Sequence, residues 1–238
     1  MTSPALPQFL FFTEVSPLYR DIFDRHFFPS YASEFSQCSS LLARDSANVQ
    51  YGSEAFQQQM LARAKLRAEA AEKHRPDGEF GGTVLVYCDS DIRFYPGARA
   101  ALRDAVKPGS IYCSADSPTI ACGGFMAFIP SLATSMFFSA IPGFMEKYSF
   151  EHDQAAMNHE LFPHRSMLER LPPTFWTHGL AGGDPAVWDG QDPAALPPLP
   201  ASRIVMHHAN FTLGAQNKMR LLDHYAAAMN PPADAANP

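Results

Sequence analysis

The sequence predicts an α/β fold: a single domain with a central mixed, mostly parallel sheet flanked by helices. Two observations carry this prediction, beside a general alternation of strand-like and helix-like segments along the chain. The run Thr83–Cys88 is apolar without polar alternation, which is typical of a central strand covered on both faces. Ser53–His74, just before it, is rich in helix-forming residues, and Ser53 can cap its N-terminus.

The remaining elements follow from local patterns along the chain. Further strands are expected at Gln8–Phe12, Glu34–Leu42, Ser110–Cys113, Phe125–Ile129, Thr174–Trp176 and Arg203–His208. Further helices are expected at Pro17–Phe28, ended by Pro29, and at Ala98–Val106, His152–Leu161 and Lys218–Met229. Residues 179–202 should form a long loop and 230–238 a disordered tail, so we expect one domain over 1–229.

Composition excludes several classes of protein. With 46% hydrophobic and 18% charged residues, the 238-residue chain is an ordinary globular sequence. Its net charge of −6 argues against nucleic-acid binding. No apolar stretch is long enough to span a membrane or to serve as a signal peptide. The four cysteines form no CxxC pair, which favours free thiols in a reducing compartment. We therefore expect a cytoplasmic protein, or a catalytic domain excised from a longer one.

The motif that points most clearly to chemistry is Asp89-Ser90-Asp91, directly after the run Thr83–Cys88. The carboxyl ends of strands are where α/β sheets bind their ligands. Two neighbouring carboxylates supply the hard oxygen ligands that suit Mg²⁺ or Mn²⁺ on a diphosphate. The alternative is that one Asp only begins a turn.

Two later clusters add imidazole, amide and ammonium groups. His207 and His208 end an expected strand and are followed by Asn210, Gly214 and Lys218. Because neighbouring strand residues point to opposite faces, only one of the two histidines can enter a site. Packing of one ring in the core and exposure of the other is the alternative.

The other cluster is Asp153-Gln154, with Asn158 one helical turn further on. Its polar groups could hold sugar hydroxyls. The alternative is an acidic first turn that merely favours the helix dipole.

In their order along the chain, these clusters resemble the GT-A nucleotide-sugar glycosyltransferases, especially glycosyltransferase families 8 and 77. The resemblance runs from about Phe11 to Tyr225 and implies a GT-A (Rossmann-like) fold. It rests on Asp89-Ser90-Asp91, Cys122-Gly123-Gly124-Phe125, Asp153-Gln154 with Asn158, and His208 with Asn210, Gly214 and Lys218. Cys122 departs from the family's usual Asn, and the stretch His74–Gly82 reads as an insertion.

The resemblance implies roles for individual residues. Asp89, Asp91 and His208 would bind Mn²⁺ or Mg²⁺, and Asp153 with Gln154 would meet the transferred sugar as the catalytic pair. Donor-binding positions would be Thr13, Arg63, Lys65, Asp89, Ser90, Asp91, Gly123, Gly124, Asn210, Gly214 and Lys218. Arg67 lies one helical turn from Arg63 and competes for its role.

The function so implied is metal-dependent transfer of a hexosyl or pentosyl group, with retention. The donor would be a nucleotide-diphosphate sugar, with UDP favoured, and the acceptor a glycan or a small hydroxyl compound. A nucleotidyltransferase of similar fold would need a glycine-rich loop after the first strand, which Phe11–Pro17 lacks. A carbohydrate-binding protein using Trp176 and Trp188 would leave the carboxylates unexplained.

Overall fold

A computed structural model of the chain describes residues 9–49, 52–74, 83–117, 119–177 and 203–229. Its main sheet has six strands in the order β2-β1-β3-β6-β5-β7. These strands are β1 (Phe9–Val15), β2 (Ser39–Asp45), β3 (Val84–Cys88), β5 (Ile111–Ala115), β6 (Ala121–Phe128) and β7 (Leu168–Arg170). β1 runs parallel to β2 and β3, and β5 to β7, whereas β6 is antiparallel to both of its neighbours. The predicted mixed, mostly parallel sheet is confirmed.

A smaller sheet continues from the carboxyl end of β3. It has three strands, in the order β4-β9-β8: β4 (Ile92–Phe94), β9 (Met206–His208) and β8 (Phe175–Thr177). The chain passes from β3 to β4 through Asp89-Ser90-Asp91, so the carboxylate pair lies where the two sheets meet. Ile92 pairs with His208, which brings the end of β9 beside Asp91.

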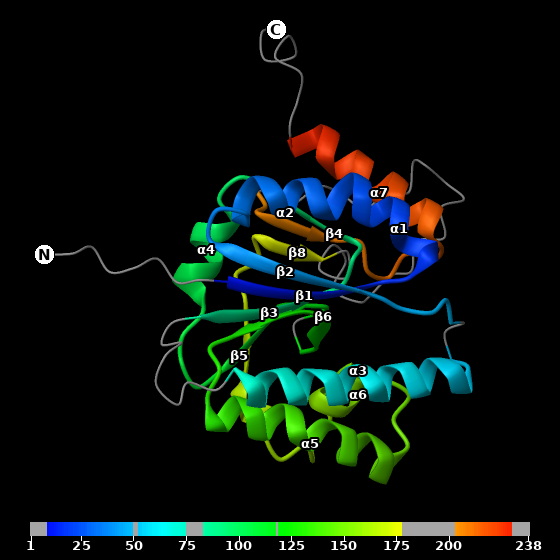
Figure 1. Cartoon of the computed structure of the whole chain (residues 1–238), viewed down its shortest axis with the longest axis vertical. Helices are drawn as coiled ribbons and strands as arrows, with labels where there is room; N and C mark the ends of the chain where they lie inside the picture. The colour runs from blue at the N-terminus through cyan, green and yellow to red at the C-terminus, as the bar shows by residue number, and fades with distance from the viewer. Residues whose placement is uncertain (1–8, 50–51, 75–82, 118, 178–202, 230–238) are drawn as a thin grey trace, which may run out of the picture.

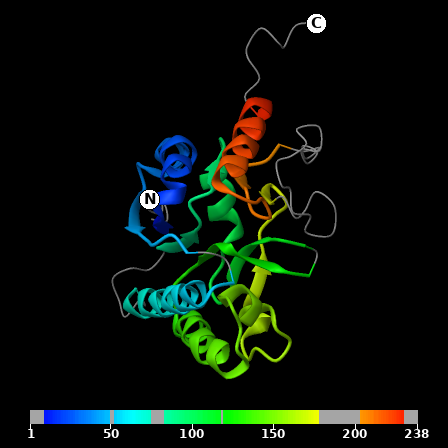
Figure 2. The same cartoon turned by 90° about the vertical axis from the view of Figure 1, so that its right-hand side faces the viewer.

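Helices cover both faces of the main sheet (Figure 1). One layer holds α3 (Glu54–Lys73), α5 (Leu132–Tyr148) and α6 (Asp153–Asn158). On the opposite side lie α4 (Ala98–Ala105), α7 (Ala215–Met229) and the consecutive segments η1 (Pro17–Tyr19), α1 (Arg20–Ile22), η2 (Phe23–Phe27) and α2 (Phe28–Phe35). Figure 2 shows the same two layers from the side, with α7 far from α3 and α5. A short helix, η3 (Arg165–Met167), precedes β7.

Apolar side chains fill the space on each side of the main sheet. All of β3 is buried, as expected for a strand covered on both faces. On the α2 side, aromatic rings pack together, among them Phe11, Phe27, Phe35, Phe94 and Phe125. On the α3 and α5 side, Leu85 and Met126 meet Phe137 and Phe138. Full burial of such a side chain contributes about 1.5–3 kcal/mol, so the two layers hold the strand ends firmly.

Two expectations at the N-terminal end are wrong. Pro29 does not end a helix: it lies in the first turn of α2, where a residue without an N–H group is tolerated. The π-helical segment η2 precedes it. The helix consequently runs to Phe35, into the range expected as the strand Glu34–Leu42, and β2 begins only at Ser39.

Further along the chain, the main omission is α5, which begins with a capping box between Ser131 and Thr134. The helix expected at His152–Leu161 is real but ends at Asn158. The short strands β4 and β7 were also not expected, whereas the other predicted elements are present with small shifts of their ends. The predicted loop at 179–202 and tail at 230–238 lie outside the described residues.

The cysteines are free, as predicted. Cys88, Cys113 and Cys122 are buried and Cys38 is half-buried. Within the described ranges, no helix has the length and apolar character needed to cross a membrane.

Candidate metal and nucleotide site

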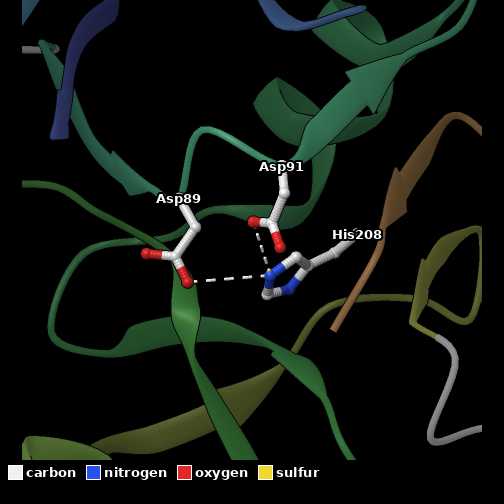
Figure 3. Close-up of side chains that lie close together, drawn as sticks. All are labelled: Asp89, Asp91 and His208. Atoms are coloured by element: carbon white, nitrogen blue, oxygen red, sulfur yellow. Dashed lines mark ion pairs between the residues drawn. The ribbon is translucent and has the colours of Figure 1, made fainter. Parts of the chain in front are cut away.

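Three side chains converge where the two sheets meet: Asp89, Asp91 and His208 (Figure 3). The His208 Nε2 atom lies 3.6 Å from Asp89 Oδ2 and 3.3 Å from Asp91 Oδ1. One ligand atom from each residue lies within 4.8 Å of the other two. Two carboxylate oxygens and an imidazole nitrogen are a donor set that suits Mn²⁺ or Mg²⁺, so these residues fit a divalent cation.

The second ring nitrogen of His208 orients the imidazole. His208 Nδ1 lies 3.5 Å from Cys122 Sγ, which leaves Nε2 facing the two carboxylates. Metal-binding histidines typically use their other nitrogen in this way, although the partner is more often an oxygen. Cys122, which departs from the family pattern, thus contacts the histidine of the cluster.

His207 points the other way, as strand alternation predicts. Its ring is fully buried and stacks on Tyr225 of α7, with 4.0 Å between the ring centroids. His208 is therefore the only one of this pair that the strand brings to the carboxylates.

Gly124 on β6 makes room for the cluster. A Cβ atom at this position would overlap both Asp89 Oδ2 and the His208 ring. The Gly124 carbonyl also accepts a hydrogen bond of 2.7 Å from the Asp89 backbone N–H. A side chain at this position is excluded if Asp89 and His208 are to meet.

Two cations flank the carboxylates. Arg63 of α3 pairs with Asp89, and Lys218 of α7 pairs with Asp91. Although burial alone would raise the pKa of Asp91, Lys218 and His208 hold it well below its ordinary value. Asp91 therefore carries its negative charge at neutral pH, which metal binding requires.

A cleft of about 270 Å³ opens beside this cluster. Its lining comes from the end of β1, η1, the segment after β2, one face of α3, the carboxylate turn and the first turn of α7. The lining residues include Glu14, Tyr19, Asn48, Phe56, Arg63, Ser90, Asp91 and Lys218. It thus offers apolar and aromatic surface together with carboxylates and cations, and the Tyr19 ring centroid lies 5.6 Å from the Lys218 ammonium nitrogen.

The predicted sugar-contacting pair, Asp153 and Gln154, lies in the first turn of α6. Asp153 is buried and pairs with Arg67. Gln154 Oε1 accepts a 2.7 Å hydrogen bond from the Gly123 N–H, and Gln154 Nε2 donates a 2.8 Å bond to Asp116 Oδ2. These contacts join α6 to α3, to β6 and to the residue that follows β5.

Asp116 belongs to the candidate site but was not predicted from the sequence. It follows β5, at the same sheet edge as Asp89, and is 2% exposed. Its Oδ1 accepts a 2.5 Å hydrogen bond from Asn210 Nδ2, so it links Gln154 to the segment after His208. Burial raises its pKa, against the opposing effects of His208 and of hydrogen bonds from Cys122 and Gln154. Asp116 comes shortly after the predicted strand Ser110–Cys113. A carboxylate at the carboxyl end of a strand is the sequence pattern that would have indicated it.

The structure does not bring every predicted donor residue to the cleft. Lys65 points toward α5, where its ammonium group lies 3.6 Å from Glu146. Thr13 is buried on β1 and lines a neighbouring crevice with Leu42 and Leu66 rather than the cleft itself. Gly214 directly precedes α7, the helix that carries Lys218, and has a positive φ of 80°, which glycine adopts without strain.

Comparisons with known proteins agree with the fold. No protein-family model matches the sequence, and no curated protein matches it either. Among solved structures, the chain is similar to a glycosyltransferase involved in the glycosylation of the major capsid of PBCV-1. The TM-score is 0.56 at 11% identity, and the match covers 91% of this chain and 100% of that one. At this identity the likeness shows the fold, a GT-A-like Rossmann arrangement.

Proposed function

We propose that this protein is a metal-dependent glycosyltransferase that uses a nucleotide-diphosphate sugar, with UDP favoured as the nucleotide. The observation that carries the proposal is the cluster of Asp89, Asp91 and His208 at the end of β3, beside a cleft lined by Lys218. A glycosyltransferase with a similar fold adds support.

The side chains have separate tasks in this proposal. A divalent cation bound by the triad would stabilise the charge that develops on the leaving diphosphate. Lys218 and Arg63 place positive charge beside the same diphosphate. The apolar and aromatic lining of the cleft, which includes Phe56 and Met60, has the character that a nucleoside requires.

The transferred sugar would lie toward α6. Asp153, Gln154 and Asp116 form a hydrogen-bonded polar group at the start of α6, in which both aspartates are buried and Gln154 is half-buried. Fixed carboxylate and amide groups can orient sugar hydroxyls toward a hexosyl or pentosyl transfer. The Asp153-Gln154 pair is the feature that favours retention, and the acceptor would be a glycan or a small hydroxyl compound.

A panel of nucleotide sugars tests this function. Thermal stabilisation and donor hydrolysis would be measured with Mn²⁺, with Mg²⁺ and with chelator. We expect one nucleotide sugar to stabilise the protein only when a divalent cation is present, with slow hydrolysis to free sugar. Stabilisation by a nucleoside triphosphate with release of pyrophosphate would instead identify a nucleotidyltransferase. Stabilisation by glycans alone would identify a carbohydrate-binding protein.

A further inference from the structure

Among the described residues, Arg67 is the most deeply buried arginine or lysine, at 1% exposure. It lies on α3 one turn after Arg63, but the two arginines differ in surroundings. Arg63 lines the cleft and pairs with Asp89, whereas Arg67 lies behind it, against the ring of Tyr87 at 5.4 Å. A buried guanidinium is costly unless its charge and its N–H groups are satisfied.

Both terminal nitrogens of Arg67 are used within the protein. Nη1 donates to Asp153 Oδ2, and Nη2 donates a 3.0 Å hydrogen bond to the Gly123 carbonyl. The second oxygen of Asp153 accepts a 2.9 Å bond from the Gln154 backbone N–H. One side chain of α3 therefore fixes the first turn of α6 and the middle of β6 together.

These contacts form a closed arrangement around Gly123. The Gly123 carbonyl accepts a hydrogen bond from Arg67, and the Gly123 N–H donates one to Gln154. Asp153 connects Arg67 and Gln154 by accepting a hydrogen bond from each. The next residue, Gly124, lies against Asp89 and His208. Displacing Arg67 would thus move the Asp153-Gln154 pair directly, whereas the triad would be reached only through Gly124.

We propose that Arg67 is a positioning residue for the transferred sugar: it holds Asp153, Gln154 and Gly123 in place without contacting the donor. This inference rests on the proposed function. It differs from a contact role because the guanidinium is almost fully buried and faces Asp153 and the Gly123 carbonyl. Arg67 borders the crevice of Thr13, Leu42 and Leu66, but it does not line the cleft beside the triad.

This arrangement predicts different effects of Arg67 on the binding of a nucleotide sugar and on the binding of a nucleoside diphosphate. A nucleoside diphosphate needs the triad, Lys218 and the cleft, none of which Arg67 contacts in the described structure. The sugar of the donor needs the Asp153-Gln154 pair. Loss of Arg67 should therefore weaken binding of the nucleotide sugar more than binding of the nucleoside diphosphate.

The test uses Arg67→Lys, which keeps the charge but cannot make both hydrogen bonds in the same geometry. Calorimetry with Mn²⁺ measures the Kd of the nucleotide sugar that gives the largest shift in the donor panel, and of the corresponding nucleoside diphosphate. We expect the Kd of the sugar nucleotide to rise about tenfold, the magnitude of one hydrogen bond to a charged group, and that of the diphosphate to change less than about threefold. kcat should fall by about ten- to a hundredfold.

Two controls keep the test decisive. Arg103→Lys alters an exposed arginine of α4 and should change neither Kd. A second variant, Arg67→Gln, removes the charge but keeps a hydrogen-bond donor and leaves Asp153 unchanged; if it folds, it should shift the ratio of the two Kd values in the same direction as Arg67→Lys. If Arg67→Lys kept the parent's ratio of the two Kd values, or raised both equally, the positioning role would be wrong. If the parent bound neither compound with Mn²⁺, the proposed function itself would fail.

Discussion

Gly124 and the two acidic residues of the cluster show how tightly the candidate metal site is packed. Asp89 follows a strand of the main sheet, His208 belongs to the smaller sheet, and the two side chains meet over Gly124 of β6. Gly123, its neighbour, faces Gln154 instead, where a Cβ atom would lie 3.1 Å from the Gln154 Cβ. The two glycines therefore serve different sides of the candidate site: Gly124 lies against Asp89 and His208, and Gly123 lies against Gln154.

We predict that Gly124→Ala lowers Mn²⁺ affinity by at least about tenfold, because the new methyl group pushes Asp89 and His208 apart. Isothermal titration with Mn²⁺ in the presence of UDP measures this loss. Gly143→Ala is the matched control, since nothing lies within 4 Å of a Cβ atom at that position on α5. Unchanged affinity in Gly124→Ala would mean that the cation binds elsewhere.

The two adjacent histidines give opposite predictions. His208→Ala should lower Mn²⁺ affinity by at least about tenfold, with little change in the stability of the metal-free protein. His207→Ala should spare metal binding but cost about 2–3 kcal/mol of stability, because its ring is buried against Tyr225. Metal titration and urea unfolding of both variants measure the two effects. A metal defect in His207→Ala alone would contradict the orientation of β9.

At the scale of elements, His26 connects three segments that lie far apart in the sequence. From η2, its Nδ1 lies 3.0 Å from an Arg93 nitrogen on β4, and its Nε2 lies 3.3 Å from Asp223 Oδ1 on α7. Burial, with Arg93 and Arg25, lowers the pKa of His26 to about 4, although Asp223 opposes this. The ring is therefore neutral in the folded protein at neutral pH.

This pKa predicts a loss of stability in acid. The unfolded chain takes up a proton at His26 near its ordinary pKa of about 6.5, whereas the folded protein does so only near pH 4, so stability falls as the pH drops through this window. The contribution is at most about 3 kcal/mol. Urea unfolding of the parent and of His26→Gln between pH 4 and 7 measures it. The variant should lose stability less steeply, and parallel curves would contradict the assignment.

Elements with a single strong periodic or apolar signal could be predicted from the sequence. The helix with its Ser53 cap and the buried strand before Asp89 are both present. α5 was missed because Pro142 and Gly143 break the helical pattern, while burial of Phe137, Phe138 and Ile141 outweighs that local preference. The end of the first helix was misplaced because Pro29 is tolerated within a first turn.

At the scale of the whole molecule, the candidate site depends on distances that no local pattern encodes. Its carboxylates, histidine and lysine could be named from the sequence because they lie at the end of a predicted strand or the start of a predicted helix, in an order that resembles a known family. The pairing of Arg63 with Asp89 and of Arg67 with Asp153, and the place of Asp116, follow from how α3 and α6 pack on the sheet. Sequence spacing alone did not separate the two arginines.

The overall charge of −6 makes the local cations more important. Around the triad, the two carboxylates of Asp89 and Asp91 face the two cations of Arg63 and Lys218. A divalent ion bound there alone would repel both cations, whereas a diphosphate bound with it would attract them. Metal and nucleotide should therefore bind together.

Thermal unfolding with Mn²⁺, UDP or both tests this coupling in the parent and in Lys218→Met. For the parent we expect a clear rise in Tm only with both ligands, since saturation at a hundred times the Kd adds about 2.7 kcal/mol of stability. Without the ammonium group beside Asp91, Mn²⁺ alone should bind about tenfold more tightly, and Mn²⁺ with UDP about tenfold more weakly. Lys107→Met, at an exposed lysine after α4, should behave as the parent does. If Mn²⁺ alone stabilised the parent as much as Mn²⁺ with UDP, or if Lys218→Met weakened binding of Mn²⁺ alone, the coupling through Lys218 would be refuted.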